Sequence, residues 1–195
     1  MKNLADNNDV LSNFDAHGRY VLPDYDHQKP FSSFLPGIAG LQGIPMWAFY
    51  VNRGQAVCSF GVEDKDHPIL EFQAANKAYQ TTALMGFRTF LNGLGEGEKW
   101  QREVFAPWNA GDTQRTMAIG MNEVEVQEIN TALGYQVNVL YFMLPGMPFS
   151  GLVRRVNIKN ITDVPMNLEV LDGLPGIIPY GVDNGALKHI SRTIE

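Results

Sequence analysis

The sequence predicts an all-β fold, an antiparallel β-sandwich, and three observations support this prediction. Apolar and polar residues alternate with a period of two in several short segments, as in strands that bury one face. Glycine, proline, asparagine and aspartate separate these segments at intervals that are typical of turns. No segment shows a convincing helical stripe of apolar residues, so we expect sheets that pack face to face without crossover helices.

The expected elements follow an N-terminal arm over residues 1–13, which we expect to be disordered or extended. The clearest strand is 135–141, where Val137 and Val139 alternate with Gln136 and Asn138. Segments 155–159 and 166–170 alternate in the same way around the polar loop 160–163, which predicts a hairpin. The other expected strands are 18–22, 47–51, 56–62, 69–72, 86–91, 99–105, 116–119 and 123–129.

The end of the sequence, ALKHISRTIE, has a strand-like pattern without a closing turn. An unpaired strand edge is normally covered in folded proteins. We therefore expect the β-sandwich domain over 14–195 to be incomplete and to continue past this chain.

The composition indicates one domain with neutral or sugar-like partners. A chain of 195 residues that is 45% hydrophobic and 18% charged can enclose one hydrophobic core. The net charge of −6, from 21 acidic and 15 basic residues spread along the chain, offers no footprint for nucleic acid or anionic membrane. The N-terminus has no secretory pattern, and the longest apolar run, 139–144, is far below the roughly 18–20 residues of a membrane helix. A soluble, cytoplasmic protein is expected.

Several patterns that could carry chemistry are better explained as structure. The segment GLGEGEK over 93–99 lacks the ending of a phosphate loop and carries two glutamates, so a hairpin loop is expected. Cys58 can form no disulfide within the chain, and neither it nor Ser32-Ser33 has an identifiable base. The four histidines are His17, His27, His67 and His189, and none has a second ligand at a spacing used by zinc sites. We therefore expect no metal and no cofactor. Three acidic pairs are expected to be solvated turn residues rather than glycosidase carboxylates: Asp24/Asp26, Asp64/Asp66 and Glu123/Glu125.

The segment 30–80 is dense in glycine, proline, aromatic and amide residues, a composition that favours a recognition surface. Sugar rings stack on aromatic side chains and their hydroxyls bind planar amides and guanidinium groups, so carbohydrate is the expected ligand. The alternative is structural: aromatics such as Phe49 and Phe60 form the core, and the polar residues lie in turns. The candidates for a carbohydrate-binding, cleft or interface role are Trp47, Tyr50, Asn52, Arg53, Gln55, Asn76, Lys77, Tyr79 and Gln80.

Three stretches of the sequence are FSSFLPGIAGLQGIPMWAFYVNRGQ, EFQAANKAYQ and GFRTFLN. They resemble the N-terminal region of 1,2-β-oligoglucan phosphorylases, which are relatives of cellobiose phosphorylase in glycoside hydrolase family 94. The later RRVNIKNITDVPMNLEVLDGLPGIIPYG is similar to their sandwich domain, so the resemblance spans residue 14 to the C-terminus. It implies a mutarotase-like supersandwich, followed in the complete enzyme by a helical linker, an (α/α)6 barrel and a small C-terminal β domain. This chain would cover part of the first domain.

The resemblance also implies the chemistry. Such an enzyme is an inverting, cytoplasmic, homodimeric phosphorylase that cleaves a β-glucoside with inorganic phosphate and yields α-glucose 1-phosphate. Its catalytic acid is an aspartate of the barrel, so no residue here inherits a catalytic role. The candidates on 47–55 would then line the cleft or the dimer interface, and alanine at Arg53 or Gln55 is expected to alter turnover or acceptor KM without unfolding the protein.

Three alternatives stay open on the sequence. A stand-alone carbohydrate-binding module would bind a glucan by itself. A mutarotase-like epimerase would need a glutamate base and paired histidines, for which His67 and His189 are too isolated in sequence to give support. A scaffold or oligomerisation domain would use its aromatics for structure alone.

Overall fold

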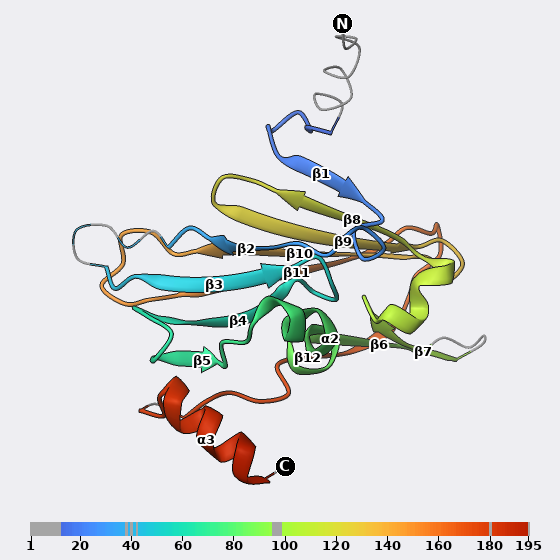
Figure 1. The fold of residues 1–195 in the computed structure, drawn as a ribbon. Coiled ribbons are helices and arrows are strands. Elements are labelled where there is room, and N and C mark those ends of the chain that lie inside the picture. The colour runs from blue at the N-terminus through green and yellow to red at the C-terminus, as the bar shows by residue number, and fades with distance from the viewer. Residues whose placement is uncertain are drawn as a thin grey trace, which may run out of the picture.

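The computed structural model describes residues 13–37, 39, 41, 43–94, 99–179 and 181–194. Within these residues the chain forms twelve β-strands in three sheets, and every strand pair within them is antiparallel (Figure 1). The predicted all-β sandwich is confirmed. Residues 1–12 of the expected N-terminal arm lie outside the described residues.

Sheet A has five strands in the order β1-β8-β9-β10-β11. Its strand β10 (Tyr135–Met143) alternates strictly between buried and half-buried residues, as the sequence predicted, because one face of the sheet meets the core. The other strands are β1 (Tyr20–Pro23), β8 (Gln114–Ile119), β9 (Glu123–Asn130) and β11 (Leu152–Asn160).

Sheets B and C lie at opposite sides of the molecule, left and right in Figure 1. Sheet B has the order β2-β3-β4-β5, with β2 (Ser32–Leu35), β3 (Met46–Val51), β4 (Val57–Val62) and β5 (Pro68–Leu70). Sheet C has the order β12-β6-β7, with β12 (Leu168–Gly173), β6 (Arg88–Gly93) and β7 (Trp100–Val104). Strands β6 and β7 pair directly, with Gly93 opposite Trp100, as the predicted hairpin requires. Residues 95–98 of the segment 93–99 lie outside the described residues.

One hydrophobic core joins the three sheets. Sheet A contributes Val126, Val139 and Tyr141, sheet B contributes Tyr50, and sheet C contributes Leu91, all at most 4% exposed. Sheets B and C therefore share the apolar inner face of sheet A, which is the packing of a sandwich.

Helix α2 (Ala75–Met85) covers the outer face of sheet B, so the expectation that no segment is helical was wrong. Its small buried residue Ala78 packs in a second cluster with Phe49, Val51 and Cys58 of the sheet. The helix ends at Gly86, whose N–H bonds the carbonyl of Thr82 at 2.9 Å. Ala78 and Thr82 are its only buried residues among those described, so the sequence shows no wide apolar stripe.

Two further predictions near the C-terminus were wrong. The segments predicted as one hairpin belong to different sheets, because β11 pairs with β10 and β12 pairs with β6. The final segment forms helix α3 (Asn184–Ile194), not a strand. Asp183 begins this helix by accepting a hydrogen bond at 2.7 Å from the N–H of Ala186. No helix in the described part of the chain is long and apolar enough to cross a membrane.

Candidate functional site

The nine predicted site residues do not converge on one cleft. Trp47 and Tyr50 lie on opposite faces of β3, as the alternation of that strand requires. Tyr50 is 4% exposed in the main core, whereas Trp47 packs on the α2 side against Phe72 and donates from Nε1 to the carbonyl of Asp64 at 2.7 Å. Both aromatics serve the packing of sheet B.

Asn52 and Arg53 hold a neighbouring turn in place. The fully buried Asn52 amide accepts a bond from the N–H of Phe31 at 3.0 Å and donates to the carbonyls of Tyr25 and Lys29 at 2.9 and 3.0 Å. The Arg53 guanidinium donates to the carbonyl of Gln28 at 3.2 Å. These contacts explain why the sequence places an amide and a guanidinium here without requiring a ligand.

The remaining candidates lie elsewhere. Gln55 is 2% exposed and hydrogen-bonded inside the molecule, as described below. Asn76, Lys77 and Gln80 are exposed on α2, and Tyr79 is half-buried against sheet B. Residues 53–55, between the expected strands 47–51 and 56–62, form a turn in which the N–H of Ala56 bonds the carbonyl of Arg53 at 2.9 Å, with Gly54 and Ala56 in the left-handed region at φ of +52° and +66°.

The three acidic pairs lie in three different environments. Asp64 and Asp66 are turn residues, as predicted, and Asp64 Oδ1 accepts a bond from the N–H of Asp66 at 2.8 Å. Glu123 and Glu125 are not turn residues but lie on β9, and both bind the guanidinium of Arg19. Asp26 is not solvated, because its side chain is only 8% exposed and pairs with a buried arginine.

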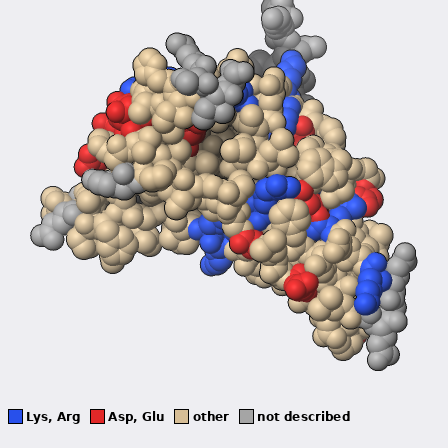
Figure 2. Space-filling model, turned by 90° about the horizontal axis from the view of Figure 1, so that it is seen from below, with Lys and Arg blue, Asp and Glu red and all other residues tan. Residues whose placement is uncertain are grey.

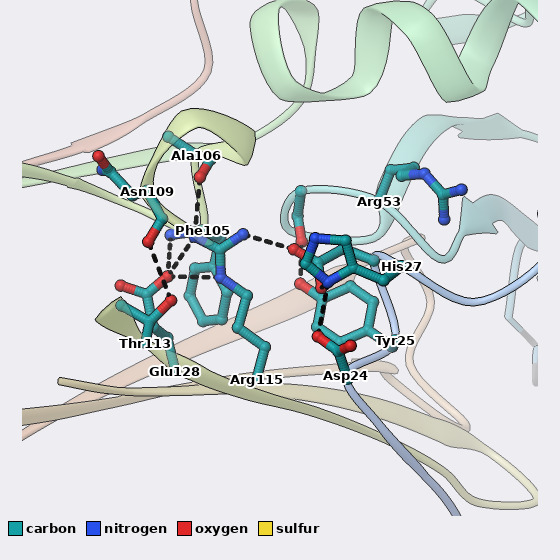
Figure 3. A network of polar contacts seen from close by, with 12 residues as sticks. Asp24, Tyr25, His27, Arg53, Phe105, Ala106, Asn109, Thr113, Arg115 and Glu128 are labelled. Carbon is teal, nitrogen blue, oxygen red and sulfur yellow. Dashed lines mark hydrogen bonds and ion pairs between the residues drawn. The ribbon is translucent and has the colours of Figure 1, made fainter. Parts of the chain in front are cut away.

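That arginine, Arg115, is the centre of a buried polar network (Figure 3). It lies on β8 directly opposite Glu128 on β9, and its Nε donates to Glu128 Oε2 at 2.9 Å. Its two other nitrogens bind Asp26 Oδ2 at 2.5 Å and the carbonyl of Ala106 at 2.8 Å. We call Arg115, Glu128, Asp26 and Tyr135 the Arg115 network.

Glu128 is fully buried and both of its oxygens are occupied. Oε2 also accepts the N–H of Phe105 at 2.7 Å, and Oε1 accepts the hydroxyl of Tyr135 at 2.8 Å. Burial, then the charge of Glu128, raise the pKa of Tyr135 well above its ordinary value. A carboxylate closed in this way has no open oxygen for a substrate, so Glu128 and its bonds to Arg115 and Tyr135 are structural.

A second arginine, Arg154 on β11, joins sheet A to sheet C with a side chain that is 9% exposed. Its guanidinium binds both oxygens of Asp172 on β12, at 2.5 and 2.8 Å, and Gln55 Oε1 at 2.5 Å. Thr89 Oγ1 contacts Arg154 at 3.1 Å and the amide of Gln55 at 2.9 Å. Burial opposes the charge of Asp172, but the bonds from Arg154 and Thr89 lower its pKa below the ordinary 3.8. We call Arg154, Asp172, Thr89 and Gln55 the Arg154 network.

The outer face of sheet C carries an open groove of about 570 Å³. Cross-strand neighbours form its wall: Phe90 on β6 lies opposite Leu171 on β12 and Glu103 on β7. The groove is lined by Phe90, Asn92, Gln101, Glu103, Glu169 and Leu171. A smaller hollow of about 190 Å³ shares Phe90 and Leu171 and reaches Asp172, so the Arg154 network borders it. We call the larger hollow the sheet C groove.

Ion pairs and hydrogen bonds fix the polar side chains of the sheet C groove. Arg88 binds both oxygens of Glu103, at 2.6 and 2.9 Å, and its guanidinium lies 4.9 Å from the centre of the Phe90 ring. Asn92 donates to Glu169 Oε2 at 2.9 Å. Sequence reasoning missed this surface, since only the strand register shows that these residues share a face. On the face drawn in Figure 2, basic and acidic side chains form small mixed groups among neutral ones.

A comparison with models of known protein families finds no match for this chain. A comparison with curated proteins finds none either.

Proposed function

We propose that this chain is the N-terminal β-sandwich part of an inverting glycoside phosphorylase. The enzyme would reversibly cleave β-glucosides, β-1,2-gluco-oligosaccharides in particular, with inorganic phosphate and yield α-glucose 1-phosphate. The resemblance of residues 14–195 supports the enzyme class. The role proposed for this part is contact with the gluco-oligosaccharide, in an enzyme that we expect to be a homodimer.

The sheet C groove is the observation that carries the carbohydrate part of this proposal. Pyranose rings present an apolar C–H face and a rim of hydroxyls. The groove offers one aromatic ring, Phe90, beside the amides of Asn92 and Gln101 and the carboxylates of Glu103 and Glu169. These groups accept and donate hydrogen bonds in fixed planes, as hydroxyl recognition requires.

The proton transfer of phosphorolysis is assigned to another part of the enzyme. An inverting reaction needs a carboxylic acid that protonates the glycosidic oxygen while phosphate attacks the opposite face of the sugar. Arg88 binds both oxygens of Glu103, at 2.6 and 2.9 Å, so neither oxygen is free to face a glycosidic oxygen. The resemblance places the acid in the barrel, so the groove supplies binding only.

Two experiments test the proposal. Calorimetry of this chain with a β-1,2-gluco-oligosaccharide is expected to show saturable binding that Phe90→Ala weakens at least about tenfold, because stacking on the ring is lost. Gln80→Ala, on the exposed side of α2, is the matched control and should leave the affinity unchanged. No saturable heat, or equal losses in the two variants, would contradict carbohydrate binding in the groove.

The second experiment concerns the reaction. The polypeptide encoded by the complete gene is expected to form α-glucose 1-phosphate from the oligosaccharide and inorganic phosphate, and this chain alone is expected to form none. Binding without phosphorolysis by the complete polypeptide would favour the stand-alone carbohydrate-binding module. The epimerase alternative needs histidines beside the glutamates of the groove, and neither His67 nor His189 is among the residues that line it.

A further inference from the structure

We propose that the turn Asp24-Tyr25-Asp26-His27, between β1 and β2, binds one divalent transition-metal ion, Zn²⁺ or Mn²⁺. Its ligands would be the carboxylates of Asp24 and Asp26 and the imidazole of His27. One ligand atom from each of these three residues lies within 4.8 Å of the other two. In Figure 3 the dashed line joins His27 Nδ1 to Asp24 Oδ1, which are 2.6 Å apart.

A buried carboxylate oxygen points into this cluster without a hydrogen-bond partner. The side chain of Asp26 is 8% exposed, and Arg115 occupies its Oδ2 at 2.5 Å. Its Oδ1 is buried and accepts no hydrogen bond within the described structure, while His27 Nδ1 lies 3.6 Å away. A buried carboxylate oxygen without a partner is costly, and a cation between it and the imidazole would satisfy it.

The charges around the cluster favour a divalent cation. Arg115 and Glu128 neutralise each other next to Asp26, since the guanidinium binds both carboxylates. The carboxylates of Asp24 and Asp26 then leave an excess of negative charge beside the imidazole of His27. The guanidinium of Arg53 is directed away from His27 in Figure 3 and bonds the carbonyl of Gln28.

The turn is held in one shape before any ion binds. Tyr25 is fully buried and its hydroxyl donates to the carbonyl of Gly54. The side chain of Asn52 donates to the carbonyl of Tyr25 at 2.9 Å, and the N–H of Asp24 donates to the carbonyl of Arg115 at 2.7 Å. A site built on a fixed backbone loses little conformational entropy when it binds.

The donor set selects the class of ion. One imidazole with two carboxylates suits Zn²⁺ or Mn²⁺, whereas Mg²⁺ and Ca²⁺ prefer oxygen ligands alone. Asp24 and His27 have side chains that are 65% and 58% exposed, so they can part to admit an ion at bonds of roughly 2.0–2.2 Å. Water would complete the coordination on the exposed side. Histidine spacing gave no sign of this site in the sequence because two of its three ligands are aspartates.

The chain contains its own control for this proposal. The turn Asp64-Lys65-Asp66-His67 has the same Asp-x-Asp-His pattern, and His67 Nδ1 lies 2.9 Å from Asp64 Oδ1. In this second turn, however, the carboxylate of Asp66 is 46% exposed and is paired with Lys65 Nζ at 2.8 Å. The two turns therefore share the Asp-x-Asp-His pattern and the contact between the first aspartate and the histidine, and they differ in the buried, unpartnered oxygen and in the residue at the second position.

The experiment is calorimetric titration of the full chain with Zn²⁺, repeated with Mn²⁺ and with Mg²⁺. We expect saturable binding of one Zn²⁺ or Mn²⁺ per chain and none of Mg²⁺. His27→Ala and Asp26→Asn are each expected to weaken binding at least about tenfold, and His67→Ala to leave it unchanged. Because His27 is exposed, His27→Ala keeps the fold, which far-ultraviolet circular dichroism would verify.

The outcomes separate clearly. Loss of affinity in His27→Ala with a native spectrum, and wild-type affinity in His67→Ala, would support the site. Equal losses in the two histidine variants, wild-type affinity in His27→Ala, or no saturable heat in the wild-type chain would overturn it. None of these results depends on carbohydrate binding or phosphorolysis.

Discussion

The outer faces of sheets B and C both carry aromatic and aliphatic side chains, but only the face of sheet B is covered. On sheet B, Phe49 and Val51 are 6% and 0% exposed because α2 packs over them. On sheet C, Phe90 is half-buried and Leu171 is 69% exposed, and the face is hollowed by a groove. An aromatic residue on an outward-facing strand position thus becomes part of the core or part of an open groove according to what covers that face.

This difference moves the proposed recognition surface from sheet B to sheet C. The composition of 30–80 drew attention to sheet B, yet its inner face forms the main core and its outer face lies under a helix. The polar and aromatic side chains that share an open face belong instead to sheet C. Four predictions test how far the two faces differ.

The largest difference is expected in thiol reactivity. Burial under α2 raises the pKa of Cys58 from an ordinary 9.0 to about 12, so the reactive thiolate is on the order of a thousandfold rarer than in an exposed cysteine. A Cys58→Ser, Leu171→Cys variant places the thiol on sheet C instead. Reaction with a chromogenic disulfide should be at least that much slower for native Cys58, and the two rates should converge in denaturant. Equal native rates would mean that α2 does not protect sheet B.

The second prediction compares two phenylalanines. Phe49 contacts the rings of Phe34 and Phe72, with centroids 4.8 and 5.7 Å away, so Phe49→Ala should lower the free energy of unfolding by about 3–5 kcal/mol. Phe90→Ala should lower it by about 1 kcal/mol, because the ring is only half-buried. Urea unfolding measures both. Similar losses would show that the two faces are equally packed.

The third prediction concerns the attachment of sheet C. Arg154→Met removes the guanidinium that joins β11 to Asp172 on β12, and it should lower the free energy of unfolding by about 1–3 kcal/mol. The loss should be local, with faster amide exchange in β12 than in β3, because Arg154 contacts sheet C directly. Uniform exchange in the two sheets would contradict this role.

The smallest effect is a change in acid sensitivity. The native pKa of Asp172 is lowered, so its charge contributes stability above the ordinary value near 3.8, and this contribution is lost as the pH falls through the lower native value. Asp172→Asn should therefore make the free energy of unfolding fall less steeply between about pH 5 and pH 2. In an Arg154→Met background the same substitution should change the slope little, since the partner is gone. An unchanged slope in the first comparison would contradict the pairing.

Much of the strand pattern could be predicted from the sequence, because apolar and polar residues alternate along a strand wherever one face of its sheet is buried. Val137 and Val139 on β10 and Val124 and Val126 on β9 are clear cases. Helix α2 could not be predicted, since Ala78 and Thr82 are its only buried residues among those described and the sequence therefore shows no wide apolar stripe. In α3, Leu187 and Ile190 have helical spacing, but the short segment also alternates enough to resemble a strand.

The site was less predictable, because it depends on pairing between distant segments. Arg115 and Glu128 are directly opposite each other, yet they are 13 residues apart in the chain. Phe90 and Leu171 carry no signal until the register of β6 against β12 is known. The alternation in 166–170 identified a strand but not its partner, which is why a hairpin with β11 was expected.

The pairing of β12 with β6 has a consequence for the order of folding. Asn92 and Glu169 are bonded although they are 77 positions apart in the chain, and Thr89 and Asp172 are 83 positions apart. Contacts of such long range form late, since the entropy of a large loop must be lost first. During synthesis β6 and β7 leave the ribosome before β12, so one edge of β6 stays unpaired until β12 has been made. The groove therefore forms only after β12 has paired, and until then the bare edge of β6 is open to aggregation.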